Sequence, residues 1–233
     1  MHIFYTPHID TSAELPEEES QHCVRVLRLT EGDEICLTDG KGCFYRASIT
    51  LAHPKRCGFD ILEKIPSPNS WGCRLHIAVA PTKNMDRMEW MAEKCTEIGI
   101  DGISFLRCRF SERKEIKKER IEKIVVSAAK QSLKATLPAV SEMTDFQRFV
   151  SRPFDGEKYI AHCYDEGDKV SLKEAYQRGR NALVLIGPEG DFSREEVEMA
   201  RACGFVPVTL GNSRLRTETA CIAACHTLQL ANE

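Results

Sequence analysis

The sequence has no long hydrophobic run and no recognisable export signal. None of its apolar stretches approaches the ~18 to 20 residues that a membrane-spanning helix needs. The first residues, MHIFYTPHID, carry no basic segment followed by an apolar one, so they do not resemble a signal peptide. We therefore expect a protein that works in the cytoplasm and has no membrane partner.

Closely spaced cysteine pairs are also missing, although cysteine itself is abundant. The chain has 11 cysteines, and none of them forms a C-x-x-C pair. Structural zinc sites normally use closely spaced thiolates or imidazoles, so we expect no metal site. Cys221, Cys225 and His226 could share a helical neighbourhood, but packing of small side chains is the simpler interpretation. Scattered free thiols are typical of a reducing compartment.

The familiar phosphate-binding loops are absent as well. No G-x-G-x-x-G follows a strand-like segment and no G-x-x-x-x-G-K-[ST] occurs, which argues against an ordinary nucleotide-binding enzyme. The formal net charge of -3 does not show the basic excess typical of nucleic-acid-binding domains. Residues 107–123 nevertheless hold eight Lys or Arg against four Glu. This segment is either a solvated helix, with Lys118 and Glu122 at i,i+4 spacing, or a surface that meets phosphates.

The chain is long enough for one large domain or two small ones. It has 233 residues, of which 42% are hydrophobic and 29% charged, as in globular proteins. PSPNS at 66–70 is the best linker candidate, because consecutive X-Pro steps favour extended backbone. Before it, residues 34–50 predict a hairpin around DGKG, residues 57–65 predict another strand, and residues 17–29 predict a short helix. We expect a β-rich N-terminal domain, whose cationic residues are Arg25, Arg28, Lys41 and Arg46.

Strand and helix patterns alternate after this linker. Residues 84–99 predict a helix in which Met88, Met91, Cys95 and Ile98 share one face, and Gly99 is a natural cap. The alternation predicts a mostly parallel α/β sheet. Its predicted strands are residues 74–80, 102–106, 158–163, 182–186 and 205–210, and its other helices include residues 112–131 and 171–178.

Two glycine-bearing turns stand near the C-terminus, in LIGPEGDFS at 185–193 and TLGNSRLRTETA at 209–220. The run ALVLI before the first turn is typical of a strand buried on both faces. Ser193 and Glu196 have the spacing of a capping box, and Thr217 is a predicted N-cap. We expect both turns at the carboxyl ends of strands, where open α/β sheets bind ligands.

These residues resemble a known family. The segment LVLIGPEGDFSREEVEMARACGFVPVTLGNSRLRTETA is similar to the C-terminal motifs of the SPOUT-class ribosomal RNA small subunit methyltransferase E family. Two departures stand out: Asp191 replaces a common second glycine, and Lys134 replaces a usual arginine. The resemblance covers nearly the whole chain. In the N-terminal part it lies in His22 with VLR at 26–28, GD at 32–33 and DGKG at 39–42. Further along it lies in Lys83 with KCTEIG at 94–99, and in QS at 131–132 with Pro138.

The resemblance implies an α/β fold with a C-terminal SPOUT-type trefoil-knot domain at 71–233 and a small N-terminal PUA-like, RNA-binding β-barrel at 1–68. It implies a homodimer that uses S-adenosylmethionine to methylate N3 of a specific uridine in 16S ribosomal RNA, free or within the small ribosomal subunit. The alternatives are another SPOUT enzyme, acting on transfer RNA or on a ribose hydroxyl, and a non-catalytic RNA-binding assembly factor.

The resemblance also implies roles for individual residues. Beside the expected cofactor position, our own hypothesis is that Arg216 stabilises the uracil anion or anchors a phosphate, with Arg214 next to it. Glu218 would orient Arg216 or act as base, and Glu189 competes for the orienting role. The alternative is that Arg216 and Glu218 form a salt bridge at the dimer interface. RNA contacts would come from Arg25, Arg28, Lys83 and Lys134. The cofactor-binding residues would be Ile186, Gly187, Pro188, Glu189, Gly190, Leu210, Gly211, Leu215, Arg216 and Thr217.

Overall fold

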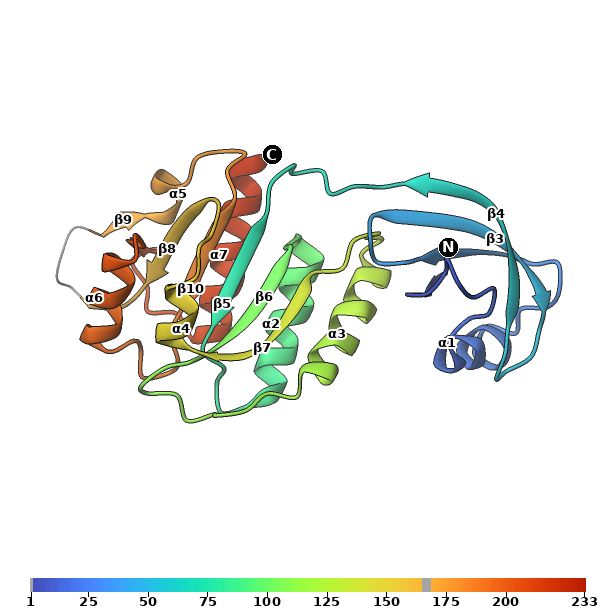
Figure 1. Ribbon diagram of the computed structural model, residues 1–233, viewed down its shortest axis with the longest axis horizontal. Helices are drawn as coiled ribbons and strands as arrows, with labels where there is room; N and C mark the ends of the chain where they lie inside the picture. The colour runs from blue at the N-terminus through green and yellow to red at the C-terminus, as the bar shows by residue number, and fades with distance from the viewer. Residues whose placement is uncertain (1, 165–168) are drawn as a thin grey trace. The chain divides into compact units, whose positions relative to one another are not determined.

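The computed structural model describes residues 2–164 and 169–233 of the chain (Figure 1). These residues form two compact units. The first unit runs to Ser70 and also takes in Val126–Leu137, and the second comprises Trp71–Val125 and Pro138–Glu233. No helix in the described ranges is long and apolar enough to cross a membrane. The domain limits 1–68 and 71–233 stay a prediction, and no sequence pattern indicated that residues 126–137 return to the first unit.

The first unit contains a four-stranded sheet in the order β1-β2-β3-β4. The predicted hairpin is confirmed, because β2 (Glu34–Thr38) pairs antiparallel with β3 (Cys43–Leu51). The predicted third strand is confirmed as β4 (Gly58–Pro66), while β1 (Ile3–Tyr5), parallel to β2, was not predicted. Gly40 has φ 75°, a left-handed conformation that suits glycine in the hairpin turn.

The helix predicted at 17–29 is present but irregular. It begins as α1 (Glu17–Gln21), continues as the π-helix η1 (His22–Val26), and ends before Arg28, whose φ is 58°. Single π-helical turns inside or at the end of an α-helix are uncommon.

The helix predicted at 112–131 begins later than predicted. Helix α3 spans Lys118–Gln131, because residues 112–117 contain no buried side chain and the apolar face starts at Ile121. The predicted pair of Lys118 and Glu122 is confirmed at 3.3 Å. The last turns of α3 belong to the first unit, where the Lys130 ammonium bonds both oxygens of Glu19 at 2.6 and 2.8 Å.

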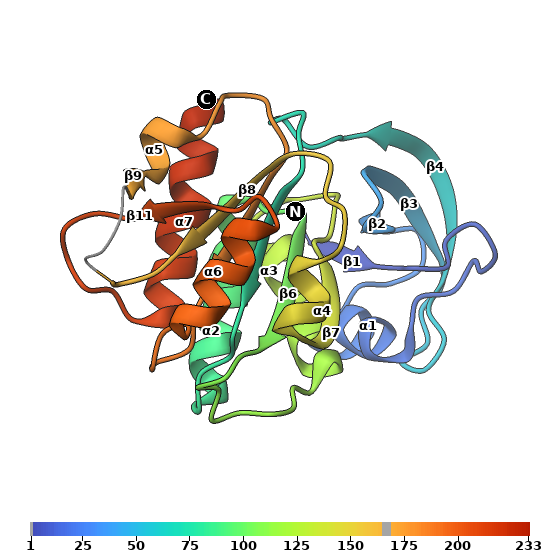
Figure 2. The same ribbon diagram turned by 60° about the vertical axis from the view of Figure 1, so that its left-hand side comes forward.

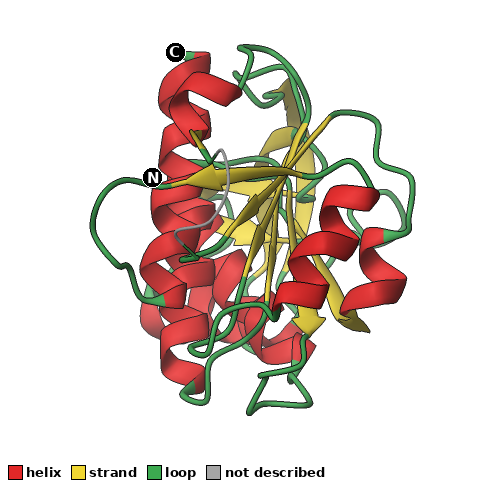
Figure 3. Cartoon of the chain, turned by 90° about the vertical axis from the view of Figure 1, so that its left-hand side faces the viewer, coloured by secondary structure: helices red, strands yellow, loops and turns green. Residues whose placement is uncertain are grey.

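The second unit is built on a seven-stranded sheet in the order β7-β6-β5-β10-β8-β11-β9, with all neighbouring pairs parallel. This confirms the predicted α/β class. Helices lie on both faces of the sheet (Figures 2 and 3). The strands are β5 (Leu75–Val79), β6 (Gly102–Arg107), β7 (Ala139–Asp145), β8 (Glu157–Ala161), β9 (Val170–Ser171), β10 (Ala182–Ile186) and β11 (Val206–Thr209).

Helix α2 (Met85–Ile98) agrees closely with the sequence prediction. The Asn84 side chain caps it by accepting a hydrogen bond from the Asp86 N–H at 2.9 Å, and Gly99 ends it with φ 123°. Met88, Met91 and Cys95 are fully buried, and Ile98 is half-buried. Helices α2 and α7 (Thr217–Asn232) pack against each other, and α7 also contacts the central strands β5 and β10.

The remaining helices are shorter. Helix α4 (Phe146–Val150) was not predicted and packs against α6 (Arg194–Ala202). Helix α5 (Leu172–Ala175) ends before the predicted residue 178, because Tyr176 is extended and buries its ring. The capping box of α6 is confirmed.

The predicted N-cap of α7 was wrong by one residue. Arg216 occupies the N-cap position, and Thr217 is the first helical residue. The Thr217 hydroxyl does not cap the helix, because it donates a hydrogen bond to the Gly187 carbonyl at 3.1 Å. This bond joins the start of α7 to the turn that follows β10.

Candidate functional site

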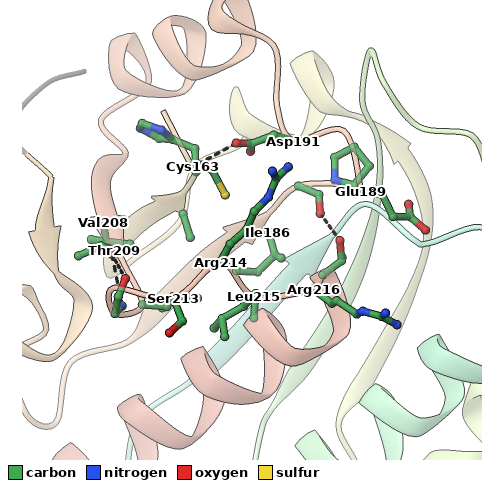
Figure 4. A pocket seen from close by; sticks show the side chains of 18 of the residues that line it. Cys163, Ile186, Glu189, Asp191, Val208, Thr209, Ser213, Arg214, Leu215 and Arg216 are labelled. Atoms are coloured by element: carbon green, nitrogen blue, oxygen red, sulfur yellow. Dashed lines mark hydrogen bonds between the residues drawn. The ribbon is translucent and has the colours of Figure 1, made fainter. Parts of the chain in front are cut away.

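A pocket of about 1040 Å³ lies at the carboxyl ends of β8, β10 and β11 (Figure 4). Two segments form much of its wall: the first turn, Gly187–Asp191, and the second turn, Leu210–Arg216. The pocket therefore stands where parallel α/β sheets bind ligands. The residues predicted to bind a cofactor all line it, namely Ile186, Gly187, Pro188, Glu189, Gly190, Leu210, Gly211, Leu215, Arg216 and Thr217, as do the predicted catalytic residues Arg214 and Glu218.

The first turn is held by hydrogen bonds to distant parts of the unit. Asp191 takes φ 65°, and its carboxylate accepts hydrogen bonds from the N–H groups of Cys163 at 2.7 Å and Phe192 at 2.8 Å. Glu189 accepts one from the Lys83 N–H at 3.1 Å. Together with the bond from Thr217, these contacts fix the turn from three sides.

The second turn is held mainly by its own residues. The Thr209 hydroxyl donates to the Gly211 carbonyl at 2.8 Å and accepts from the Gly211 N–H at 3.3 Å. Gly211 has φ 123°, and no atom lies within 4 Å of the place where its Cβ would stand. Residues 211–214 and Arg216 are exposed, whereas Leu215 is half-buried.

Two arginines of the second turn point in different directions. Figure 4 shows the Arg214 side chain reaching across the pocket toward Cys163 and Asp191, while the Arg216 side chain points away from it. Partial removal from water, and then the Asp191 carboxylate, raise the pKa of the Cys163 thiol more than the positive charge of Arg214 lowers it, so the thiol stays protonated at neutral pH.

Glu218 is the buried acid of the pocket. Its side chain is only 7% exposed, and within the described residues its ion pair is with Arg87 of α2, at 3.4 Å, and not with Arg216. The second carboxylate oxygen, Oε2, is buried and has no hydrogen-bond partner among the described residues. Glu218 also lies in the first turn of α7, where the helix dipole favours a negative charge.

Several pocket residues were missed from the sequence. Arg87, His162, Cys163, Tyr164, Lys169 and Asp191 all line the pocket. Burial lowers the pKa of the His162 imidazole, so this side chain is neutral at pH 7. His162 and Cys163 follow β8, and only the strand order, which sets β8 between β10 and β11, brings them to the two turns.

The four predicted RNA-binding residues lie outside the pocket. Arg25 belongs to η1, Arg28 follows it, and Lys134 lies in the part of the chain that returns to the first unit. Only Lys83 belongs to the second unit, where its ammonium lies 3.3 Å from Glu112 and its N–H bonds the first turn.

Comparison with known protein families matches the N-terminal part and the C-terminal part of the chain to two RNA methyltransferase domains. An RNA methyltransferase domain matches residues 69–229, and an RNA methyltransferase PUA domain matches residues 15–62. A Synechocystis sp. protein named ribosomal RNA small subunit methyltransferase E is 31% identical over 219 residues, which cover 91% of this chain and 71% of that protein. The chain belongs to the ribosomal RNA small subunit methyltransferase E family.

Solved structures of this family agree with the assignment. A probable rRNA-methyltransferase from Porphyromonas gingivalis is 44% identical, covers 100% of both chains and superposes with a TM-score of 0.93. A ribosomal RNA small subunit methyltransferase E from Neisseria gonorrhoeae, solved with bound S-adenosyl methionine, is 28% identical, with a TM-score of 0.86 over 99% of this chain and 97% of that one. The family and fold expected from the two turns are thus confirmed.

Proposed function

We propose that this enzyme transfers a methyl group from S-adenosylmethionine to N3 of a specific uridine in 16S ribosomal RNA. The observation that carries the proposal is the pocket between the two turns, which contains every residue predicted for cofactor binding and catalysis. Relatives named for the small-subunit ribosomal RNA, and one structure solved with the methyl donor, support the same activity.

The residues present fit S-adenosylmethionine. Ile186, Leu210 and Leu215 offer apolar walls, and the glycines of both turns bring backbone groups to the surface, which suits a neutral adenine better than a phosphate. The buried oxygen of Glu218 without a hydrogen-bond partner suits a ligand that carries positive charge or donor groups. When bound, this cofactor supplies a methyl group on a sulfonium, ready for attack by a nucleophile in line with the breaking bond.

The protein's chemical task is to handle the uracil N3 proton. Neutral N3–H has no lone pair in the ring plane, so a group must accept the proton or positive charges must stabilise the anion. We assign Glu218 to the first role or to the positioning of an arginine, and Arg216 to stabilising the anion or anchoring a phosphate. Arg214, which crosses the pocket, adds positive charge beside the same site. Placement of the base in line with the sulfonium accounts for much of the remaining rate enhancement.

We further propose the quaternary and topological features that the family resemblance implies. The enzyme would act as a homodimer in the cytoplasm, and the chain after β11 would thread a trefoil knot. The N-terminal domain at 1–68 would bind RNA beside a methyltransferase domain at 71–233. Sedimentation of the purified protein tests the dimer.

Mass-spectrometric mapping of 16S ribosomal RNA tests the function directly. RNA from cells that lack the protein should have lost one 3-methyluridine, and the purified enzyme with S-adenosylmethionine should restore it. A methyl group restored on transfer RNA or on a ribose hydroxyl would show a different SPOUT reaction. Failure to bind S-adenosylmethionine by calorimetry would favour a non-catalytic RNA-binding assembly factor.

A further inference from the structure

An exposed aromatic ring stands beside the first turn. Phe110 follows β6 and is 46% exposed. Its own Cβ packs against Gly190 so closely that a Cβ on Gly190 would lie 3.1 Å from it. The base of the Phe110 side chain therefore touches a residue that lines the pocket, although neither the predicted site nor the proposed mechanism uses this ring.

The backbone on both sides of Phe110 is fixed by hydrogen bonds. The Cys108 N–H donates to the Ser111 hydroxyl at 3.0 Å, and the Ser111 N–H donates to the Cys108 carbonyl at 3.1 Å. The Arg109 N–H donates to Glu196 at 2.8 Å. Glu196 is itself held by the capping box of α6, since its other oxygen accepts from the Ser193 N–H at 2.8 Å. The fold thus holds the ring at the surface instead of letting it turn inward.

The charge around this ring suits RNA. The Arg109 guanidinium lies 5.9 Å from the Phe110 ring centroid. Residues 107–117 contain five Lys or Arg against two Glu, and the segment keeps a positive excess although Arg107 is paired with Asp145 at 2.7 Å. Unpaired RNA bases stack on exposed aromatic side chains, and neighbouring cations bind the phosphates on either side.

We propose that Phe110 is a stacking platform for an unstacked pyrimidine of the RNA substrate, held at the edge of the methyl-donor pocket. Reaching the N3 atom of a uridine requires that base to leave its stack, and an aromatic face next to the first turn would compensate for the lost stacking. The inference rests on the proposed function for the identity of the base, but the stacking itself is a property of RNA binding.

Four substitutions at one position test the stacking. Phe110→Ala and Phe110→Leu should weaken binding of a uridine-containing single-stranded RNA and lower kcat/KM for methylation by about 5- to 100-fold. Phe110→Tyr and Phe110→Trp keep an aromatic face and should stay within a few-fold of the wild type. Calorimetry should show an unchanged Kd for S-adenosylmethionine in all four. Val206→Ala, which trims a 44%-exposed apolar side chain at the start of β11, is the matched control and should bind RNA normally.

Two results would overturn the inference. If Phe110→Leu binds RNA as well as Phe110→Tyr, the side chain contributes only apolar contact; if Phe110→Ala binds as well as the wild type, it contributes nothing. The binding arm does not depend on catalysis. The wild type could bind RNA through an aromatic residue at 110 and yet show no methylation. That result would contradict the proposed reaction but would still support the stacking role of Phe110.

Discussion

The two turns of the pocket are built in different ways. The first turn is tied to β8, to α7 and to the loop before α2 by hydrogen bonds from Cys163, Thr217 and Lys83. The second turn is exposed and relies on the local bonds between Thr209 and Gly211. One half of the site is thus formed before any ligand arrives. Within residues 2–164 and 169–233, the hydrogen bonds that hold the other half are local ones.

This difference indicates how the site divides its tasks. A preformed turn binds without an ordering cost, whereas a turn held only locally loses conformational freedom when a ligand contacts it. The second turn carries Arg214 and Arg216 and leads into Glu218. We therefore infer that the first turn mainly supplies cofactor affinity and the second turn supplies the charged groups for the reaction.

The largest expected effect is on the second turn. Arg216→Ala should lower the rate of methylation by about 100-fold or more, because it removes the positive charge proposed to stabilise the uracil anion or to anchor a phosphate of the RNA. The Kd for S-adenosylmethionine, measured by calorimetry, should change by no more than about 3-fold, since the Arg216 side chain points away from the pocket and the first turn remains intact. Arg216→Lys is the conservative control and should recover part of the rate. Full activity in Arg216→Ala would remove this residue from the mechanism.

A pair of glycine substitutions compares the turns directly. At Gly187 a Cβ would stand 3.0 Å from the Phe192 nitrogen and 3.2 Å from the Asp191 carbonyl carbon, both backbone atoms that cannot move away alone. Gly187→Ala should therefore weaken S-adenosylmethionine binding by about 10-fold or more. In Gly211→Ala the new Cβ would have no atom within 4 Å, but the alanine backbone would be strained at φ 123°. Because the second turn can adjust its conformation, this variant should lose less affinity for S-adenosylmethionine than Gly187→Ala. The reverse order of the two Kd values would contradict the comparison.

Substitutions of Asp191 test whether its hydrogen bonds and its backbone conformation hold the first turn in place. Asp191→Ala removes the acceptors for two N–H groups and leaves an alanine at φ 65°, so the free energy of unfolding should fall by about 1–2 kcal/mol. Asp191→Gly loses the same bonds but suits the left-handed backbone, and should be the more stable of the two variants. Thermal unfolding monitored by circular dichroism measures both. Equal melting temperatures for the two variants would show that the backbone conformation at 191 carries no strain.

The smallest expected effect is a loss of folding stability at low pH. Burial lowers the pKa of His162 from its usual 6.5, with Lys169 and Arg201 adding to the effect and Asp191 opposing it. The unfolded chain therefore takes up this proton at a higher pH than the folded one does. The resulting stability is fully present above about pH 6.5 and is lost as pH falls toward the folded-state pKa. Urea unfolding at pH 7.5 and pH 5 should show a steeper loss for wild type than for His162→Gln; parallel losses would contradict this.

Sequence patterns predicted the regular elements well where periodicity was strong. The hairpin at 34–50, the Met88 face of α2 and the capping box at Ser193 were all confirmed, because each depends on residues close in the chain. The start of α3, the irregular η1 and the strand β1 escaped prediction, since tertiary packing decides them.

The residues of the candidate site were also predictable only where they depend on local sequence. Both turns could be placed at the ends of strands from local sequence alone, and the resemblance to the family supplied their residue roles. The pairing of Glu218 with Arg87, which are more than a hundred residues apart, could not be predicted, because it depends on how α2 and α7 pack. His162 and Cys163 escaped for the same reason, as strand order alone brings them to the pocket.

Hydrogen–deuterium exchange with and without S-adenosylmethionine tests the central claim most directly. The account predicts that the amides hydrogen-bonded at the first turn, those of Cys163, Asp191 and Phe192, exchange slowly in the free enzyme, while those of 211–216 exchange fast and become strongly protected by the cofactor. If saturating cofactor leaves 211–216 unprotected, or protects only residues outside the pocket, the two turns do not enclose the methyl donor.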